Sequence, residues 1–159
     1  EMNNDLNLTN PSGTFVTSII GRYNLKTDEI ELANAGHQPA LVKTGDEFIE
    51  YSSSSTPLGV MKQKNENVYK LEKFKLNSSR VYCFTDGFSE SLDENKNEIG
   101  IDGVKELLKR HQNSKLKIEL QKVTEEIRQK SLKKEYKEKG LEEDKGILDD
   151  DLTILGIGK

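Results

Sequence analysis

The sequence predicts an α+β domain in which a mainly antiparallel sheet is followed by two amphipathic helices and a last strand. In the first half, short runs of β-branched and aromatic residues alternate with polar turns. Between residues 101 and 127, apolar residues recur at spacings of three and four, as on one face of a helix. At 159 residues the chain has the size of a single domain with one core.

The first half predicts two successive hairpins. Residues 14–25 carry Phe, Val, Ile and Tyr side chains, and a Lys-Thr-Asp-Glu turn leads from them into residues 30–33. Residues 40–43 and 48–51 repeat this pattern around a Thr-Gly-Asp-Glu turn. We therefore expect four strands, paired antiparallel within each hairpin.

Two further strands are expected at residues 68–76 and 80–84, and the second ends at Thr85-Asp86-Gly87. Helices follow at residues 101–108 and 116–127. A final apolar run, residues 152–157, is typical of a buried strand.

Two segments lie outside these elements. Residues 1–11 are rich in Asn and predict a loop or helix remnant, or a linker, before a domain that spans residues 12–159. The Lys- and Glu-rich residues 130–145 predict a solvated helix end followed by a mobile loop.

Composition excludes several classes of protein. The formal net charge is −4, and acidic residues interleave with the lysines of residues 130–145, which argues against nucleic-acid binding. No apolar stretch approaches the roughly 20 residues that span a bilayer, so no membrane contact is expected. The single cysteine, Cys83, excludes an internal disulfide and is expected in the core, which suits a reducing cytoplasm.

Acidic residues occur at the ends of two predicted strands. Asp86 follows residues 80–84, and Asp149, Asp150 and Asp151 precede residues 152–157. A carboxylate at a strand end is held by rigid backbone and open to solvent, which suits a hard divalent cation. The alternative is an Asp-Gly turn and a solvated strand cap without a ligand.

Six short segments together resemble a known family. They are Phe15-Val16-Thr17, residues 33–39 (Ala-Asn-Ala-Gly-His-Gln-Pro), Pro57-Leu58-Gly59-Val60, residues 85–90 (Thr-Asp-Gly-Phe-Ser-Glu), Ile99-Gly100 and Asp150-Asp151-Leu152-Thr153. Their order and intervals resemble the stage II sporulation E-like branch of the type 2C, metal-dependent protein Ser/Thr phosphatases. The likeness extends from about Gly13 to the end of the sequence.

The resemblance implies an α-β-β-α sandwich, with two mainly antiparallel sheets flanked by helices around a binuclear Mn²⁺ or Mg²⁺ centre. Asp86 and Asp150 match metal-binding aspartates of the family, and Glu90 matches a residue that helps hold an additional metal in some relatives. Asp151 and Thr153 would support these ligands. In such a site, the metals activate water for attack on phosphorus and no protein nucleophile is needed.

The two histidines have separate interpretations. His37 would support the site, either as a general acid for the leaving serine oxygen or by donating to a backbone carbonyl that fixes its turn. His111 ends a predicted helix, where its ring would interact favourably with the helix dipole.

One feature of the family is missing from this sequence. Members carry a Gly-Asp followed by a further Asp in the first third of the domain, and no such segment precedes Phe15. We therefore expect the N-terminal part of the domain to be missing and the isolated chain to be nearly inactive. It is either a fragment of a longer phosphatase or a non-catalytic binding or regulatory module.

The resemblance also implies partners. The substrate would be a phosphorylated regulatory protein, such as an anti-sigma-factor antagonist. An upstream sensor or receiver domain is expected in the full-length protein.

Overall fold

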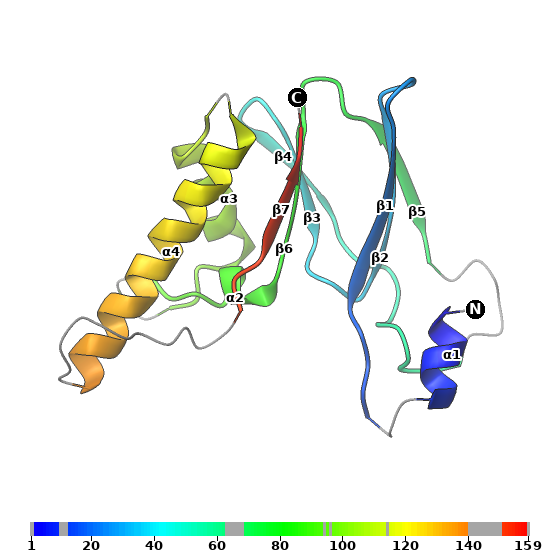
Figure 1. Ribbon diagram of the computed structural model, residues 1–159, viewed down its shortest axis with the longest axis horizontal. Helices are drawn as coiled ribbons and strands as arrows, with labels where there is room; N and C mark the ends of the chain where they lie inside the picture. Colours follow the sequence, from blue (N-terminus) through cyan, green and yellow to red (C-terminus); the bar gives the residue numbers. More distant parts are fainter. Residues whose placement is uncertain are drawn as a thin grey trace. The chain divides into compact units, whose positions relative to one another are not determined.

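The computed structural model of the protein describes residues 2–9, 13–62, 69–93, 95, 97–113, 115–139 and 151–158, with side chains in the last helix described as far as Lys130. The elements, in chain order, are α1 (Met2–Thr9), β1 (Ser18–Asn24), β2 (Glu29–Ala35), β3 (Ala40–Thr44), β4 (Glu47–Tyr51), β5 (Leu71–Lys75), β6 (Arg80–Phe84), α2 (Asp86–Ser89), α3 (Gly100–Arg110), α4 (Leu116–Lys139) and β7 (Ile154–Ile157). Figure 1 shows these elements along the chain. They confirm the α+β class, with two antiparallel sheets flanked by helices.

The first sheet has the order β1-β2-β5 and is antiparallel throughout. Alternation along the central strand β2 buries Ile30 and Leu32 on one face. On the opposite face Ala33 pairs with Ile20 and Leu71, which are 57% and 59% exposed. One face of this sheet therefore packs into the core, and the other is open among the described residues.

The second sheet has the order β4-β3-β6-β7. Its strand β3 pairs antiparallel with both β4 and β6, and Ala40, Leu41 and Val42 are buried in succession. A continuous run of buried residues is typical of a strand covered on both faces. Tyr51 of β4 stacks on Phe74 of the first sheet with ring centroids 4.8 Å apart, so aromatic packing joins the two sheets.

The helices α3 and α4 pack through the apolar stripes that the sequence predicted. Val104, Leu107 and Leu108 of α3 are buried, as are Val123 and Ile127 of α4. Full burial of such a side chain stabilises the fold by about 1.5–3 kcal/mol. Figure 1 shows α4 running beside β7, which it contacts.

The observed elements differ from the predicted ones in several details. The first strand begins at Ser18, and Val16 forms an isolated bridge with Leu58 instead. α2 is a single helical turn where the sequence predicted only a turn after the strand. Residues 1–11 contain the helix α1, and α4 continues to Lys139.

Cys83 is half-buried rather than a full core residue. Burial nevertheless raises the pKa of its thiol. We therefore expect a thiol that is protonated at neutral pH and chemically quiet.

The chain divides into two compact units near the end of β6. The first contains Glu1–Cys83, and the second contains Phe84–Ile157. α1 belongs to the first unit, where the buried Asn3 accepts a hydrogen bond from Gly59 N (3.0 Å) and donates one to Met61 O (3.0 Å). The proposed boundary between residues 11 and 12 stays a prediction. None of the described helices combines the length and the hydropathy needed to span a bilayer.

Candidate active site

The segment after β6 is hydrogen-bonded to the segment before β7. Thr85 N donates to Thr153 O (3.0 Å), and the Thr85 hydroxyl donates to Asp151 O (2.8 Å). The same hydroxyl accepts a bond from Thr153 N (3.1 Å). One threonine thus ties together two acidic motifs that lie 66 residues apart.

Gly87 allows the two segments to approach this closely. A Cβ atom at this position would lie 2.9 Å from Asp151 O and 3.3 Å from Leu152 Cδ2. Side chains do not tolerate such a distance to a backbone oxygen, so the Gly of the Thr-Asp-Gly motif is required by packing rather than by its φ angle.

The short helix α2 holds Asp86 at this junction. Glu90 N donates to Asp86 O (2.8 Å), as does the Ser89 hydroxyl (3.0 Å). The Asp86 side chain is exposed, and its Oδ1 accepts a bond from Gly87 N (3.2 Å). Its backbone is therefore fixed while its carboxylate is open to solvent.

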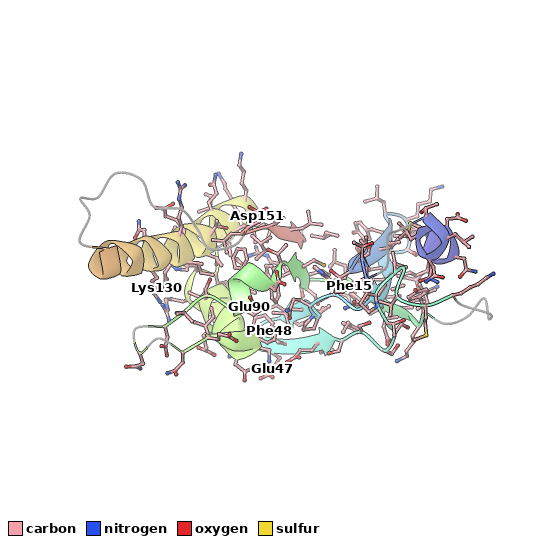
Figure 2. The ribbon with its side chains drawn as sticks, turned by 90° about the horizontal axis from the view of Figure 1, so that it is seen from below. Phe15, Glu47, Phe48, Glu90, Lys130 and Asp151 are labelled. Carbon is pink, nitrogen blue, oxygen red and sulfur yellow. The ribbon has the colours of Figure 1, made fainter. Side chains whose placement is uncertain are left out.

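The other predicted ligands lie around this point or outside the described residues. Asp150 falls outside them, so its predicted convergence with Asp86 stays a prediction. Figure 2 shows the labelled side chains of Glu90, just after α2, and of Asp151, at the start of the segment that leads into β7. Within the described part of the chain, no three His, Cys, Asp or Glu side chains are grouped closely enough to hold a metal ion.

Thr153 contributes to the junction through its backbone. Its backbone N and O bond to Thr85, whereas the hydroxyl that bridges the two segments belongs to Thr85. Sequence reasoning missed Thr85 as a contact residue. A Thr directly before an Asp-Gly at a strand end is the signal that could have identified it.

A hydrogen-bonded turn in the first unit contains His37. The buried side chain of Asn34 donates to the carbonyls of His37 (3.3 Å), Gln38 (3.1 Å) and Tyr51 (3.4 Å). Its Oδ1 accepts a bond from His37 N (2.9 Å). A single buried amide therefore fixes the turn between β2 and β3.

Ser53 and Pro57 complete this turn. The Ser53 hydroxyl accepts a bond from Gly36 N (2.8 Å) and donates to Asn34 O (2.9 Å). Gly36 has φ +68°, and a Cβ there would lie 2.6 Å from Pro57 Cδ. Within the run of serines at residues 52–55, Ser53 therefore has a structural role, which the low-complexity composition of the run did not indicate.

Among the described residues, the His37 ring makes no hydrogen bond to a backbone carbonyl, which differs from one of the two expectations. Its Nδ1 lies 3.0 Å from the Thr17 hydroxyl. Asn34 and Ser53 fix the backbone of the turn instead.

His111 follows the last residue of α3, as predicted, and pairs with α4. Its Nε2 lies 2.5 Å from Glu126 Oε2, and Arg110 and Lys130 bind Glu126 Oε1 at 2.6 and 2.9 Å. Burial raises the pKa of Glu126, but hydrogen bonds from Lys130 and His111 and the charges of Lys130 and Arg110 outweigh burial and lower it to about 2. His111 therefore joins two helices, and no hydrogen bond or ion pair within the described residues links it to the Thr85 junction.

An open groove of about 970 Å³ runs between α4 and the segment that includes β7. Leu116, Leu120, Leu152 and Ile154 contribute apolar side chains to it, and Thr153 lines it as well. The groove therefore reaches the junction that Thr85 forms.

Comparison with known proteins identifies the family. The sequence model of stage II sporulation protein E (SpoIIE) matches residues 1–158. The chain belongs to the SpoIIE family. No curated protein matches the chain significantly.

Solved phosphatase domains share the SpoIIE-family fold of this chain. A structure of the PP2C phosphatase domain and a fragment of the regulatory domain of SpoIIE from Bacillus subtilis matches with TM-score 0.65 and 18% identity, over 90% of this chain and 37% of that one. The Mn-presoaked phosphatase domain of the same protein matches with TM-score 0.60 and 16% identity, over 89% and 56%. The SiaA-PP2C domain of Pseudomonas aeruginosa matches with TM-score 0.61 and 18% identity, over 84% and 48%. This SpoIIE-family chain thus spans about half the length of the structures it matches.

The residues of the junction partly fit the Mn²⁺ or Mg²⁺ that the SpoIIE family implies. Asp86 presents an exposed carboxylate on fixed backbone, which is the oxygen ligand that these hard cations prefer. Asp86 alone does not close a site. Further ligands would have to come from Asp150, Asp151 or residues outside this sequence.

Proposed function

We propose that the chain is part of a metal-dependent protein Ser/Thr phosphatase domain that acts on a phosphorylated regulatory protein in the cytoplasm, such as an anti-sigma-factor antagonist. The observation that supports this most strongly is the junction at which Thr85 binds both Asp151 and Thr153. It joins the Thr-Asp-Gly and Asp-Asp-Leu-Thr motifs. An isolated Asp-Gly turn or a solvated strand cap would not require this contact.

In this proposal Asp86 and Asp150 hold the cations, and Glu90 and Asp151 lie beside them. Bound Mn²⁺ or Mg²⁺ would neutralise phosphoryl charge and activate water for in-line attack. The chain's own residues orient the ligands, because Thr85 fixes the spacing of the two segments and Gly87 permits their contact. The remaining ligands would come from a Gly-Asp segment outside this sequence.

A metal titration tests the proposal. Mn²⁺ that binds only the folded chain raises its free energy of unfolding by about 2.7 kcal/mol at 100 times Kd. We expect the melting temperature to rise only at high micromolar to millimolar Mn²⁺, because the site is incomplete. Asp86→Asn and Asp150→Asn should abolish the rise, whereas Asp46→Asn, in an exposed Gly-Asp turn of the first unit, should leave it unchanged. A wild-type chain indifferent to millimolar Mn²⁺ would contradict the metal site.

Activity distinguishes the phosphatase from a non-catalytic regulatory module on the same scaffold. The chain alone should hydrolyse a phosphoserine protein at close to the background rate. A longer polypeptide that adds a Gly-Asp segment should show Mn²⁺-dependent hydrolysis that Asp86→Asn removes. Persistent inactivity of that longer polypeptide would favour the module.

A further inference from the structure

Two serine hydroxyls bind the single helical turn α2, and they bind different peptide groups in it. The Ser89 hydroxyl donates to the carbonyl of Asp86 (3.0 Å), and the Ser91 hydroxyl donates to the carbonyl of Gly87 (2.5 Å). Serine makes such bonds readily because its hydroxyl lies close to the main chain. Ser89 belongs to the Thr-Asp-Gly-Phe-Ser-Glu segment, whereas Ser91 follows it.

The turn α2 needs support from outside its own backbone. A helix of four residues is unstable by itself in water, because it makes too few hydrogen bonds for the residues that it orders. The fully buried Phe88 packs edge-on against Phe84, with ring centroids 6.2 Å apart, and so attaches the middle of α2 to the end of β6. Asp86 precedes this contact, and the Thr85 side chain makes no capping bond to the turn.

The peptide group between Asp86 and Gly87 is hydrogen-bonded at both ends. Its oxygen accepts bonds from Glu90 N (2.8 Å) and from the Ser89 hydroxyl (3.0 Å). Its N–H, on Gly87, donates to Oδ1 of Asp86 (3.2 Å). Because a peptide group is planar, bonds that fix its oxygen also fix the direction of its N–H. Ser89 therefore acts, through one rigid group, on the donor that meets the Asp86 carboxylate.

The burial of Ser89 makes its bond effective. The residue is 7% exposed, so its hydroxyl is shielded from water, and a hydrogen bond is stronger in such surroundings. The Asp86 side chain itself is exposed. Within the described residues its carboxylate accepts a bond only at Oδ1, which leaves Oδ2 available to a ligand.

We propose that Ser89 is a positioning residue for Asp86. By holding the Asp86–Gly87 peptide group, Ser89 keeps the carboxylate in one rotamer, with Oδ2 available to a divalent cation. A ligand held in one orientation by its neighbours binds more tightly than one that must first be ordered. This inference rests on the proposed metal-dependent function for the nature of the ligand.

NMR of the full chain without metal tests the effect on the rotamer. The three-bond Hα–Hβ couplings of Asp86 show whether its side chain keeps one χ1 angle or averages over several. We expect the couplings of one rotamer in the wild type and averaged couplings in Ser89→Ala. Ser91→Ala is the matched control, because its hydroxyl binds the next carbonyl, and its couplings should match the wild type. Averaged couplings in the wild type, or unchanged couplings in Ser89→Ala, would overturn the proposal.

A Mn²⁺ titration of the same proteins tests the effect on binding. Bound Mn²⁺ is paramagnetic and broadens the Gly87 amide signal, so the midpoint of broadening measures local affinity. Ser89→Ala should raise this midpoint about five- to tenfold, the scale of one hydrogen bond. Ser91→Ala should leave it unchanged, and Ser89→Thr, which keeps the hydroxyl, should retain the wild-type midpoint.

Urea denaturation separates positioning from stability. Alanine favours helical backbone and each alanine variant loses one hydroxyl, so both variants should remain folded and lose similar stability. A purely structural role would therefore shift the Mn²⁺ midpoint equally in the two variants. Such equal shifts, or no shift in Ser89→Ala, would contradict the role of Ser89.

The two readouts also separate this inference from the proposed function. If the wild type binds no Mn²⁺ at millimolar concentration, the proposed metal site fails, and the couplings alone decide whether Ser89 orients the carboxylate. If the longer polypeptide shows Mn²⁺-dependent hydrolysis while Ser89→Ala binds Mn²⁺ as the wild type does, this inference alone is overturned.

Discussion

The His37 turn and the Thr85 junction achieve rigidity by different means. Around His37, the buried amide of Asn34 and the hydroxyl of Ser53 satisfy backbone groups between residues 34 and 55, so these bonds join residues at most 19 positions apart. At Thr85 one exposed hydroxyl joins segments 66 residues apart. The first turn should therefore resist loss of a single bond, whereas the second junction depends on one residue, Thr85, through its hydroxyl and its backbone N.

Replacing Gly36 should have the largest effect. Gly36→Ala places a Cβ 2.6 Å from Pro57 Cδ at a backbone φ of +68°. Steric overlap and left-handed strain together should lower the free energy of unfolding by about 3 kcal/mol, measured by urea denaturation. Gly45→Ala is the matched control, since Gly45 has φ +59° with open space around it. An equal loss in both variants would show that strain alone, and not the packing of the turn, determines the cost.

Removing the Thr85 hydroxyl should have an intermediate effect. Thr85→Val keeps the shape of the side chain but loses the bonds to Asp151 O and Thr153 N. We expect a loss of about 1–2 kcal/mol in the free energy of unfolding and faster amide hydrogen exchange at Thr153. Thr124→Val, which loses only a bond to Leu120 O within α4, should cost less. Unchanged exchange at Thr153 would mean that the junction does not depend on this hydroxyl.

The smallest effect is expected for Glu126, which lies in the contact between α3 and α4. Because its folded pKa of about 2 lies below the ordinary 4.5, its ionised form stabilises the fold above about pH 4.5, and this contribution is lost as pH falls toward 2. Glu126→Gln should thus be less stable than wild type by about 1 kcal/mol at neutral pH, and the difference should vanish near pH 2 in melting curves. Glu125→Gln, whose carboxylate bonds to Gln129, should show little difference at either pH. A pH-independent difference for Glu126→Gln would indicate a packing role instead.

Much of the fold could be predicted because its signals are local. Alternation in residues 30–33 and spacings of three and four in α3 follow from side-chain directions in strands and helices, and both were confirmed. The same reasoning missed α2, because four residues carry too little periodicity to indicate a helix. It also missed Ser53, whose role is visible only when its partner Gly36 is placed beside it.

The sequence by itself determined the α+β class, the order of the strands and of the two long helices, and the six motif segments of the SpoIIE family, since these depend on residue type and spacing along the chain. Only the tertiary structure decided that Thr85 joins the two acidic motifs, that Gly87 is required by the close approach of Asp151, and that Thr17 meets His37. Each of these contacts joins residues at least 20 positions apart. Whether such residues meet depends on strand pairing and close packing, which no local pattern specifies.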